Sequence, residues 1–201
     1  MSRRSLRRAA LPALLVLPLM LTACGGGQER QASTEPASAA SDAPAPAGHN
    51  EHDVMFLQMM IAHHKQGVEM ARVAEDRAKR AEVRNLAAAV AATQAEEVKT
   101  MTSWLRKWSE PATTHHAPGS HAEHGGLPAT GPKEISTLKK TTGAAFEPAF
   151  LNLFVAHQHN AVKMAEEETS KGGDAEAKAF AERVKESRTD QIRQMLGMLN
   201  S

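Results

Sequence analysis

The chain has 201 residues, with 24 basic and 23 acidic side chains and a net charge of +1. Four of the arginines fall within the first eight residues, and without them the formal charge changes from +1 to −3. A mildly acidic protein lacks the basic surface that nucleic-acid binding requires, so we expect no nucleic-acid partner. Cys24 is the single cysteine, which excludes a disulfide within the chain.

The first 23 residues have the composition of an export signal. MSRRSLRR is basic, AALPALLVLPLML is a short apolar run, and LTAC is followed by glycines. The apolar run is too short for a spanning helix. LTAC resembles a bacterial lipobox, so we expect residues 1–23 to be a lipoprotein-type signal peptide and Cys24 to carry the lipid; an ordinary signal peptide with an incidental cysteine is the alternative. SRRSLR also resembles a twin-arginine signal, which leaves the export route open.

Residues 24–48 predict a flexible tether, because they are rich in Gly, Ser, Ala and Pro and offer almost nothing apolar to bury. A lipid on Cys24 and this tether predict a domain held at the bacterial membrane and facing the periplasm or the cell exterior. The remaining residues, 49–201, are long enough for one compact domain.

An internal repeat with a spacing of 94 residues organises this domain. FLQMMIAHHKQGVEMA in the first copy aligns with FLNLFVAHQHNAVKMA in the second. The ungapped alignment of residues 53–105 with 147–199 contains 13 identities in 53 pairs. Apolar residues recur at three- and four-residue spacing in both copies, which predicts amphipathic helices.

Each copy predicts a helical hairpin with a break near residues 78–81, where the second copy has two adjacent glycines. We expect hairpin one at 49–108, hairpin two at 133–200 and a linker rich in Pro, Gly and His between them at 109–132. Two hairpins that pack together predict an all-α fold, a four-helix bundle of residues 49–201.

Histidine and methionine on the predicted helices are the candidate metal ligands. Met60, His63 and Met70 share one helix face, and the repeat copies the last two as His157 and Met164. If the hairpins pack symmetrically, two imidazoles and two thioethers converge inside the bundle, a ligand set that suits Cu(I). The main candidates are Met60, His63, His64, Met70, His157 and Met164. The weaker candidates are Met59, His159 and the linker histidines His115, His116, His121 and His124, which predict loose binding of divalent metals.

Two alternatives compete with a copper-binding protein. Methionine at helical spacing usually packs a core, and a buried layer that pairs the histidines with Glu97 and its repeat partner Gln191 would satisfy the imidazoles without metal. The protein would then be a structural or partner-binding bundle. A ferritin-like redox enzyme is the second alternative, and it needs carboxylates that face the histidines. The sequence has no catalytic motif of the common hydrolase or nucleotide-binding kinds, so we expect a binding protein and no enzyme.

Three segments resemble one bacterial family, domain-of-unknown-function family 305. They are FLQMMIAHHKQGVEMA, QAEEVKTMTSWLRKW and GAAFEPAFLNLFVAHQHNAVKMA. The resemblance covers roughly residues 49–200, and the family includes CopM-like copper-binding proteins of the periplasm. It implies a ferritin-like four-helix fold and the binding of copper, mainly Cu(I), by helix Met and His residues in resistance or trafficking.

The resemblance also implies which positions belong to the motifs. They are Asp53, Met59, Met60, His63, His64, Met70, Glu147, His157 and Met164. Asp53, Glu147 and Glu97 are expected to position the ligands without binding the metal themselves. The second copy departs from the family pattern, because Gln158 replaces the second histidine and Leu153 and Phe154 occupy methionine positions. The oligomeric state and a partner for metal transfer stay open.

Overall fold

The computed structural model describes residues 48–113 and 130–201. The expected signal peptide, the lipidation site Cys24 and nearly all of the expected tether lie outside the described residues. So do the linker histidines His115, His116, His121 and His124.

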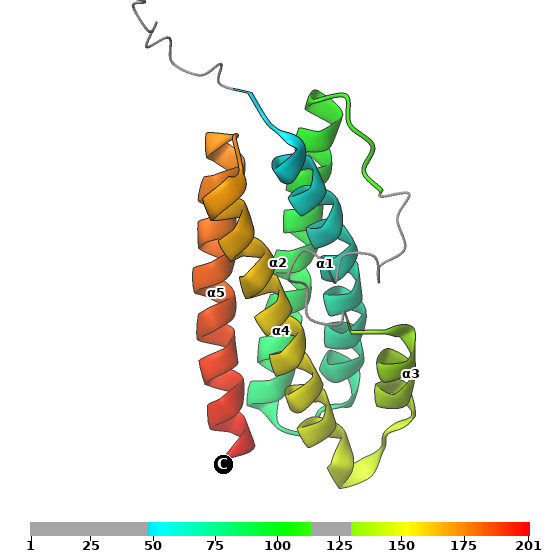
Figure 1. Ribbon diagram of the computed structural model, residues 1–201. Coiled ribbons are helices and arrows are strands. Elements are labelled where there is room, and N and C mark those ends of the chain that lie inside the picture. Colours follow the sequence, from blue (N-terminus) through cyan, green and yellow to red (C-terminus); the bar gives the residue numbers. More distant parts are fainter. Residues whose placement is uncertain (1–47, 114–129) are drawn as a thin grey trace, which may run out of the picture. The chain divides into compact units, whose positions relative to one another are not determined.

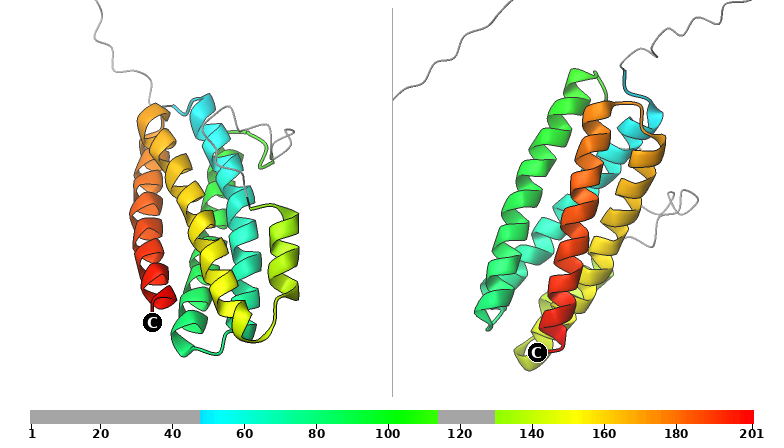
Figure 2. Two further views of the ribbon diagram at one scale, coloured as in Figure 1. Left: turned by 60° about the horizontal axis from the view of Figure 1, so that its bottom comes forward. Right: turned by 90° about the vertical axis from the view of Figure 1, so that its left-hand side faces the viewer.

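Four long helices make up most of the described residues. They are α1 (Glu51–Arg77), α2 (Ala81–Lys107), α4 (Phe146–Lys171) and α5 (Ala175–Leu199). A short helix α3 (Pro132–Lys140) and a 3-10 turn η2 (Gly143–Ala145) precede α4. The long helices α1 and α2 pack along each other, as do α4 and α5, and α1 also packs against α4 (Figures 1 and 2). No strand occurs in residues 48–113 and 130–201, and the predicted all-α four-helix bundle is confirmed.

The helix bounds follow the repeat spacing. Helices α1 and α4 end at Arg77 and Lys171, and α2 and α5 begin at Ala81 and Ala175, so each pair of equivalent ends lies 94 residues apart. The chain therefore turns at residues 78–80, within the region in which the alignment with the two glycines predicted a break.

Each helix pair provides a carboxylate that caps the N-terminus of a helix in the other pair. The carboxylate of Asp53, in the first turn of α1, accepts hydrogen bonds from the backbone N–H of Gly173 at 2.9 Å and of Asp174 at 3.0 Å, where α5 begins. At the opposite end of the bundle, Glu147 in α4 accepts from the N–H of Arg80 at 2.8 Å, where α2 begins. Asp53 and Glu147 are equivalent in the repeat, and the structure uses both to close helix N-termini across the bundle.

Buried apolar side chains form two clusters, one near each end of the bundle. The first cluster includes Phe56, Leu57, Met60, Met101 and Phe180. The second cluster, at the end where α1 meets α2, includes Met70, Phe150, Phe154, Ile192 and Met195. These side chains are removed from water on the inner faces of all four long helices, which is the main force that holds the helices together.

A layer of polar side chains separates the two clusters. This polar layer consists of His63, His64, Gln94, Glu97, His157, Gln158, Arg188 and Gln191, and all of them except Glu97 and Gln191 are buried. Each long helix contributes two of these residues. Along each helix, the buried apolar residues of the first cluster lie on one side of this pair and those of the second cluster on the other side.

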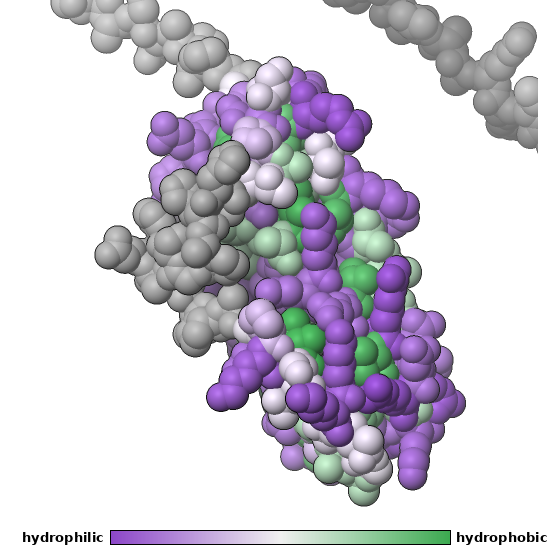
Figure 3. Space-filling model, turned by 90° about the vertical axis from the view of Figure 1, so that its right-hand side faces the viewer, coloured by the Kyte–Doolittle hydropathy of each residue, from purple (hydrophilic) through white to green (hydrophobic). Residues whose placement is uncertain are grey.

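The outer surface of the described residues is mostly polar. Figure 3 shows one face on which hydrophilic side chains dominate and hydrophobic ones appear in small patches between them. Leu196 is the one large apolar side chain that is exposed within the described residues. Among the helices that the structure describes, none combines the length and apolar character that crossing a membrane requires.

Candidate metal site

The repeat-equivalent histidines His63 and His157 meet in the polar layer. Their rings stack with centroids 3.6 Å apart and an interplanar angle of 10°. His63 Nε2 lies 3.0 Å from the backbone oxygen of His157 and donates to it, so Nδ1 of His63 keeps a free lone pair. His157 Nδ1 lies 3.0 Å from the Thr130 hydroxyl, and its Nε2 has no hydrogen-bond partner within the described residues.

This stacked pair is not arranged as a chelate. An imidazole lone pair lies in the plane of its ring, so two nearly parallel rings direct their lone pairs along separate planes and not toward one ion about 2.0 Å from both nitrogens. Within the described residues, no group of three or more His, Cys, Asp or Glu side chains is placed to hold a metal ion.

The thioethers of the main methionine candidates pack in or against the two apolar clusters. Met60 and Met70 are fully buried in the first and second apolar clusters, on opposite sides of the polar layer. Met164 is half-buried and packs against the first cluster. His159 is exposed on α4. The two histidines predicted to converge are therefore together, and the methionines predicted to join them pack in or against the apolar clusters on either side of the polar layer.

His64 pairs with Glu97 in the polar layer. Its Nε2 lies 2.7 Å from Glu97 Oε2, and the same carboxylate oxygen accepts a hydrogen bond from the guanidinium of Arg188 on α5. At the equivalent position of the second copy, the Gln158 amide donates to Gln191. A polar layer that needs no metal was one alternative from the sequence, although there Glu97 and Gln191 were expected to pair with His63 and His157. Arg188 was not among the residues predicted for this layer. Its position in the repeat, equivalent to Gln94, is the one feature of the sequence that indicates it.

Burial keeps the three histidines of the polar layer neutral. It lowers the pKa of His63 and His64 below the ordinary value, and it lowers the pKa of His157 to about 3, with the charge of Arg188 adding to each effect. Burial alone would raise the pKa of Glu97, but the hydrogen bond from His64 and the charge of Arg188 outweigh it, and the pKa of Glu97 falls. The layer therefore holds one anion and one fixed cation.

Gly67 on α1 leaves room for the polar layer. A Cβ atom at this position would lie 2.1 Å from Gln94 Oε1 and 3.0 Å from His157 Nε2. We expect Gly67→Ala to displace Gln94 and lower the free energy of unfolding by about 2 kcal/mol, measured by urea denaturation. The control is Gly197→Ala on α5, where a Cβ would meet nothing within 4 Å and the change is expected to be stabilising by up to about 1 kcal/mol. Equal effects of the two substitutions would contradict this prediction.

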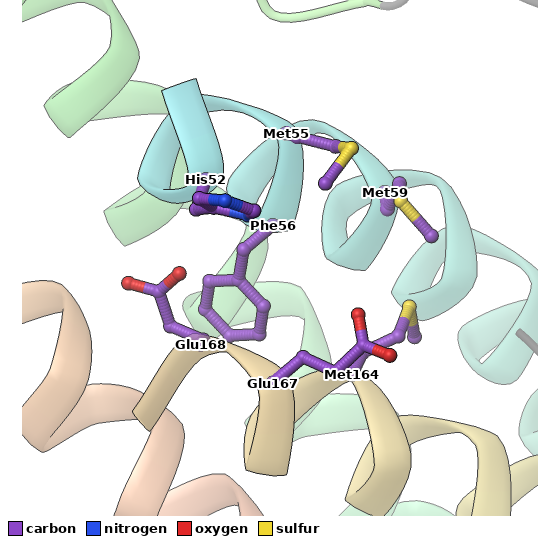
Figure 4. Close-up of a pocket in the computed structure, with 7 residues that line it drawn as sticks. All are labelled: His52, Met55, Phe56, Met59, Met164, Glu167 and Glu168. Carbon is purple, nitrogen blue, oxygen red and sulfur yellow. The ribbon is translucent and has the colours of Figure 1, made fainter. Parts of the chain in front are cut away.

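A second group of histidine and methionine residues lies at the surface, where α1 begins and α4 approaches its end. This rim pocket is lined by His52, Met55, Phe56, Met59, Met164, Glu167 and Glu168. In Figure 4, Met55 and Met59 extend from α1 and Met164 from α4, with His52 one turn before Met55. His52 and all three methionines are half-buried, so these side chains are partly accessible to solvent.

The dimensions of the rim pocket favour a single ion. Its cavity volume is about 20 Å³, which holds one ion or one water molecule and is too small for an organic ligand. Three thioethers and an imidazole form a soft ligand set, which suits Cu(I) and Ag(I) and is poor for Mg²⁺ or Ca²⁺. The carboxyl groups of Glu167 and Glu168 also line the pocket.

The sequence identified the rim pocket only in part. Met164 was a main candidate and Met59 a weaker one, but His52 and Met55 were not among the predicted ligands. A signal was present, because His52, Met55 and Met59 are spaced three and four residues apart and so share one helix face. Nothing in that spacing shows that Met164, more than 100 residues away, closes the pocket.

These features define the chain as a helical-bundle protein with a polar core layer and a methionine- and histidine-lined surface pocket. The family described as Domain of unknown function (DUF305) matches residues 53–199, and the chain belongs to this family. The resemblance seen in the sequence is thereby confirmed.

Solved structures show the same fold. A DUF305 protein from Streptomyces coelicolor is 30% identical with a TM-score of 0.69, and the match covers 74% of this chain and 92% of that one. A DUF305 fragment from Deinococcus radiodurans is 25% identical with a TM-score of 0.66 and covers 75% and 97%. CopM in its Cu(I)-bound form is 22% identical with a TM-score of 0.61 and covers 74% and 95%, a likeness that shows the fold alone. None of the curated proteins matches the sequence.

Proposed function

We propose that this protein binds Cu(I) at the rim pocket, outside the cytoplasm, in copper resistance or trafficking. The observation that carries the proposal is that Met55 and Met59 from α1 and Met164 from α4 line one surface pocket, which His52 also lines. CopM, which shares the fold, has Cu(I)-bound and Ag-bound forms, and this supports a soft-metal function for the present chain.

The chemistry of the pocket agrees with an extracytoplasmic protein. Thioethers do not form disulfides, so they remain available as ligands where thiolates are oxidised. The export signal in residues 1–23 and a lipid on Cys24 would place the domain there, held near the bacterial membrane. We propose binding without catalysis, since the core carboxylate Glu97 is already paired with His64 and Arg188. Oxygen consumption during Cu(I) loading would contradict that part of the proposal.

The test compares two sets of methionine-to-leucine substitutions in the tag-free mature chain. The triple variant Met55→Leu/Met59→Leu/Met164→Leu should weaken Cu(I) binding by roughly 100-fold, about 3 kcal/mol, in titrations against a competing chelator. The control Met101→Leu removes a fully buried thioether of the first apolar cluster and should leave the affinity unchanged. Leucine keeps the side-chain volume, so a loss reports on sulfur and not on packing.

Other outcomes would assign the ligands elsewhere. Unchanged Cu(I) affinity in the triple variant would contradict the rim pocket. Loss of binding in His63→Ala/Met70→Ala, with the fold intact by circular dichroism, would instead place copper between the buried residues that the sequence first indicated. Deletion of residues 114–129, which carry four histidines, is expected to leave the tightest site in place.

A further inference from the structure

Arg188 is a buried cation in the middle of the bundle. Its side chain is fully buried on α5, and its guanidinium donates to Glu97 Oε2 on α2. One guanidinium nitrogen, Nη2, lies 3.3 Å from His64 Nε2, and the other, Nη1, donates to the Ser187 hydroxyl at 3.0 Å. Because a guanidinium stays protonated in proteins, this charge is permanent.

The guanidinium and His64 together occupy one oxygen of the one carboxylate that the polar layer offers. Glu97 Oε2 accepts from both Arg188 and His64, which is the contact that a metal ion would otherwise make with that oxygen. Three imidazole nitrogens close to this ion pair have no hydrogen-bond partner within the described residues: His63 Nδ1, His64 Nδ1 and His157 Nε2. The layer thus holds unpaired imidazole nitrogens beside a fixed positive charge, although no three of its His and Glu side chains surround one point within the described residues.

A metal ion that entered this layer would meet two obstacles. It would compete with Arg188 for Glu97, and it would add a second positive charge beside the guanidinium in a poorly polarisable interior. With Arg188 in place, one anion and one cation balance, so the buried layer needs no further ion.

We propose that Arg188 takes the place of a metal ion in the polar layer and keeps metal cations out of the buried histidines. Without its charge, Glu97 and His64 would form a nitrogen and oxygen site for divalent ions such as Co²⁺ or Zn²⁺, which prefer these donors to thioethers. The proposal concerns a different place and a different class of ion from the Cu(I) pocket, and it does not depend on copper binding there.

The internal repeat supplies the substitution that tests this role. Gln94 occupies the position equivalent to Arg188 and is itself fully buried, so a glutamine fits an inward position of this bundle. Arg188→Gln therefore removes the charge and keeps a polar side chain of moderate length. Arg188→Lys is the matched control, because it keeps the charge and loses the planar guanidinium.

Co²⁺ is the probe, because its visible absorption reports nitrogen and oxygen coordination. In the mature chain, Arg188→Gln should bind Co²⁺ at least about tenfold more tightly than the unsubstituted protein, with new visible bands. The gain should disappear in Arg188→Gln/His64→Ala and be absent in Arg188→Lys. A folded Arg188→Gln protein without any gain, or an equal gain in Arg188→Lys, would overturn the proposal.

A measurement on the unsubstituted protein covers the case in which Arg188→Gln does not fold. Imidazole signals of His63, His64 and His157 in nuclear magnetic resonance spectra should stay unchanged when Zn²⁺ or Ag⁺ is added. A shift of any of these signals on metal addition, in the folded protein, would overturn the proposal. The signal of His52 on addition of Ag⁺ reports separately on the rim pocket, so failure of the proposed function is distinguishable from failure of this inference.

Discussion

Asp53→Ala should lower the free energy of unfolding by about 3 kcal/mol, measured by urea denaturation of the mature protein near pH 7. The Asp53 side chain is fully buried and accepts backbone hydrogen bonds from Asn50 at 2.6 Å, Gly173 at 2.9 Å and Asp174 at 3.0 Å. Removing the carboxylate leaves three backbone donors without their acceptor, at two helix N-termini at once. Each lost cap of this kind contributes about 1 kcal/mol.

Two controls separate capping from other effects at Asp53. Asp53→Asn keeps one acceptor oxygen and should lose about half as much stability. Glu147→Ala removes the repeat-equivalent cap at the other end of the bundle, and because Glu147 is partly exposed the loss should be nearer 1 kcal/mol. An Asp53→Ala protein as stable as the unsubstituted one would contradict the capping role.

The loss at Asp53 should depend on pH in a defined direction. Burial tends to raise the pKa of Asp53, but interactions with Glu168 and with the backbone N–H groups outweigh it, so the folded pKa lies below the ordinary value of 3.8. A folded pKa below the unfolded one gives stability that is present above pH 4 and is lost as the pH falls through the folded value. The difference between the Asp53→Ala and unsubstituted proteins should therefore shrink in acid.

Glu168→Gln should stabilise the protein at pH 8, by about 2 kcal/mol. Glu168 is 1% exposed beside Asp53, and burial first, then the interaction with the Asp53 carboxylate, raises the pKa of Glu168 to about 9. The folded state thus binds a proton that the unfolded state releases near pH 4.5, the ordinary value. Stability from this group is complete below pH 4.5 and is lost as the pH rises toward 9, and glutamine removes that loss because its amide donates like the protonated carboxyl.

The measurement is urea denaturation of both proteins at pH 5 and pH 8. The gain from Glu168→Gln should be present at pH 8 and almost absent at pH 5. Glu167→Gln on the neighbouring, half-buried position should change stability by less than about 0.5 kcal/mol at both pH values. The same pH dependence in Glu168→Gln as in the unsubstituted protein would show that Glu168 is ionised in the folded state.

The helical architecture of this protein was readable from its sequence. The spacing of 94 residues aligns Arg77 with Lys171 and Ala81 with Ala175, and these pairs are the observed helix ends. Periodicity also placed His63, Glu97 and His157 on inner faces, where the structure has them. Such features are local, because helix geometry alone decides which residues share a face and the two glycines mark where a helix ends.

The partners of these side chains were decided by tertiary structure. Helix periodicity shows that Met55 and Met59 share a face, but the packing of α4 on α1 places Met164 in the same pocket. The same packing places Met70 in the second apolar cluster. Likewise, the inward direction of Arg188 follows from the repeat, whereas its contact with Glu97 depends on how α5 lies beside α2. The sequence by itself determined the helices and their inner faces. Which side chains share a pocket or a hydrogen bond was decided only by the packing of one helix pair on the other. Contacts between residues about 90 or more positions apart depend on the relative position and rotation of the helices. A local sequence pattern does not determine either of these.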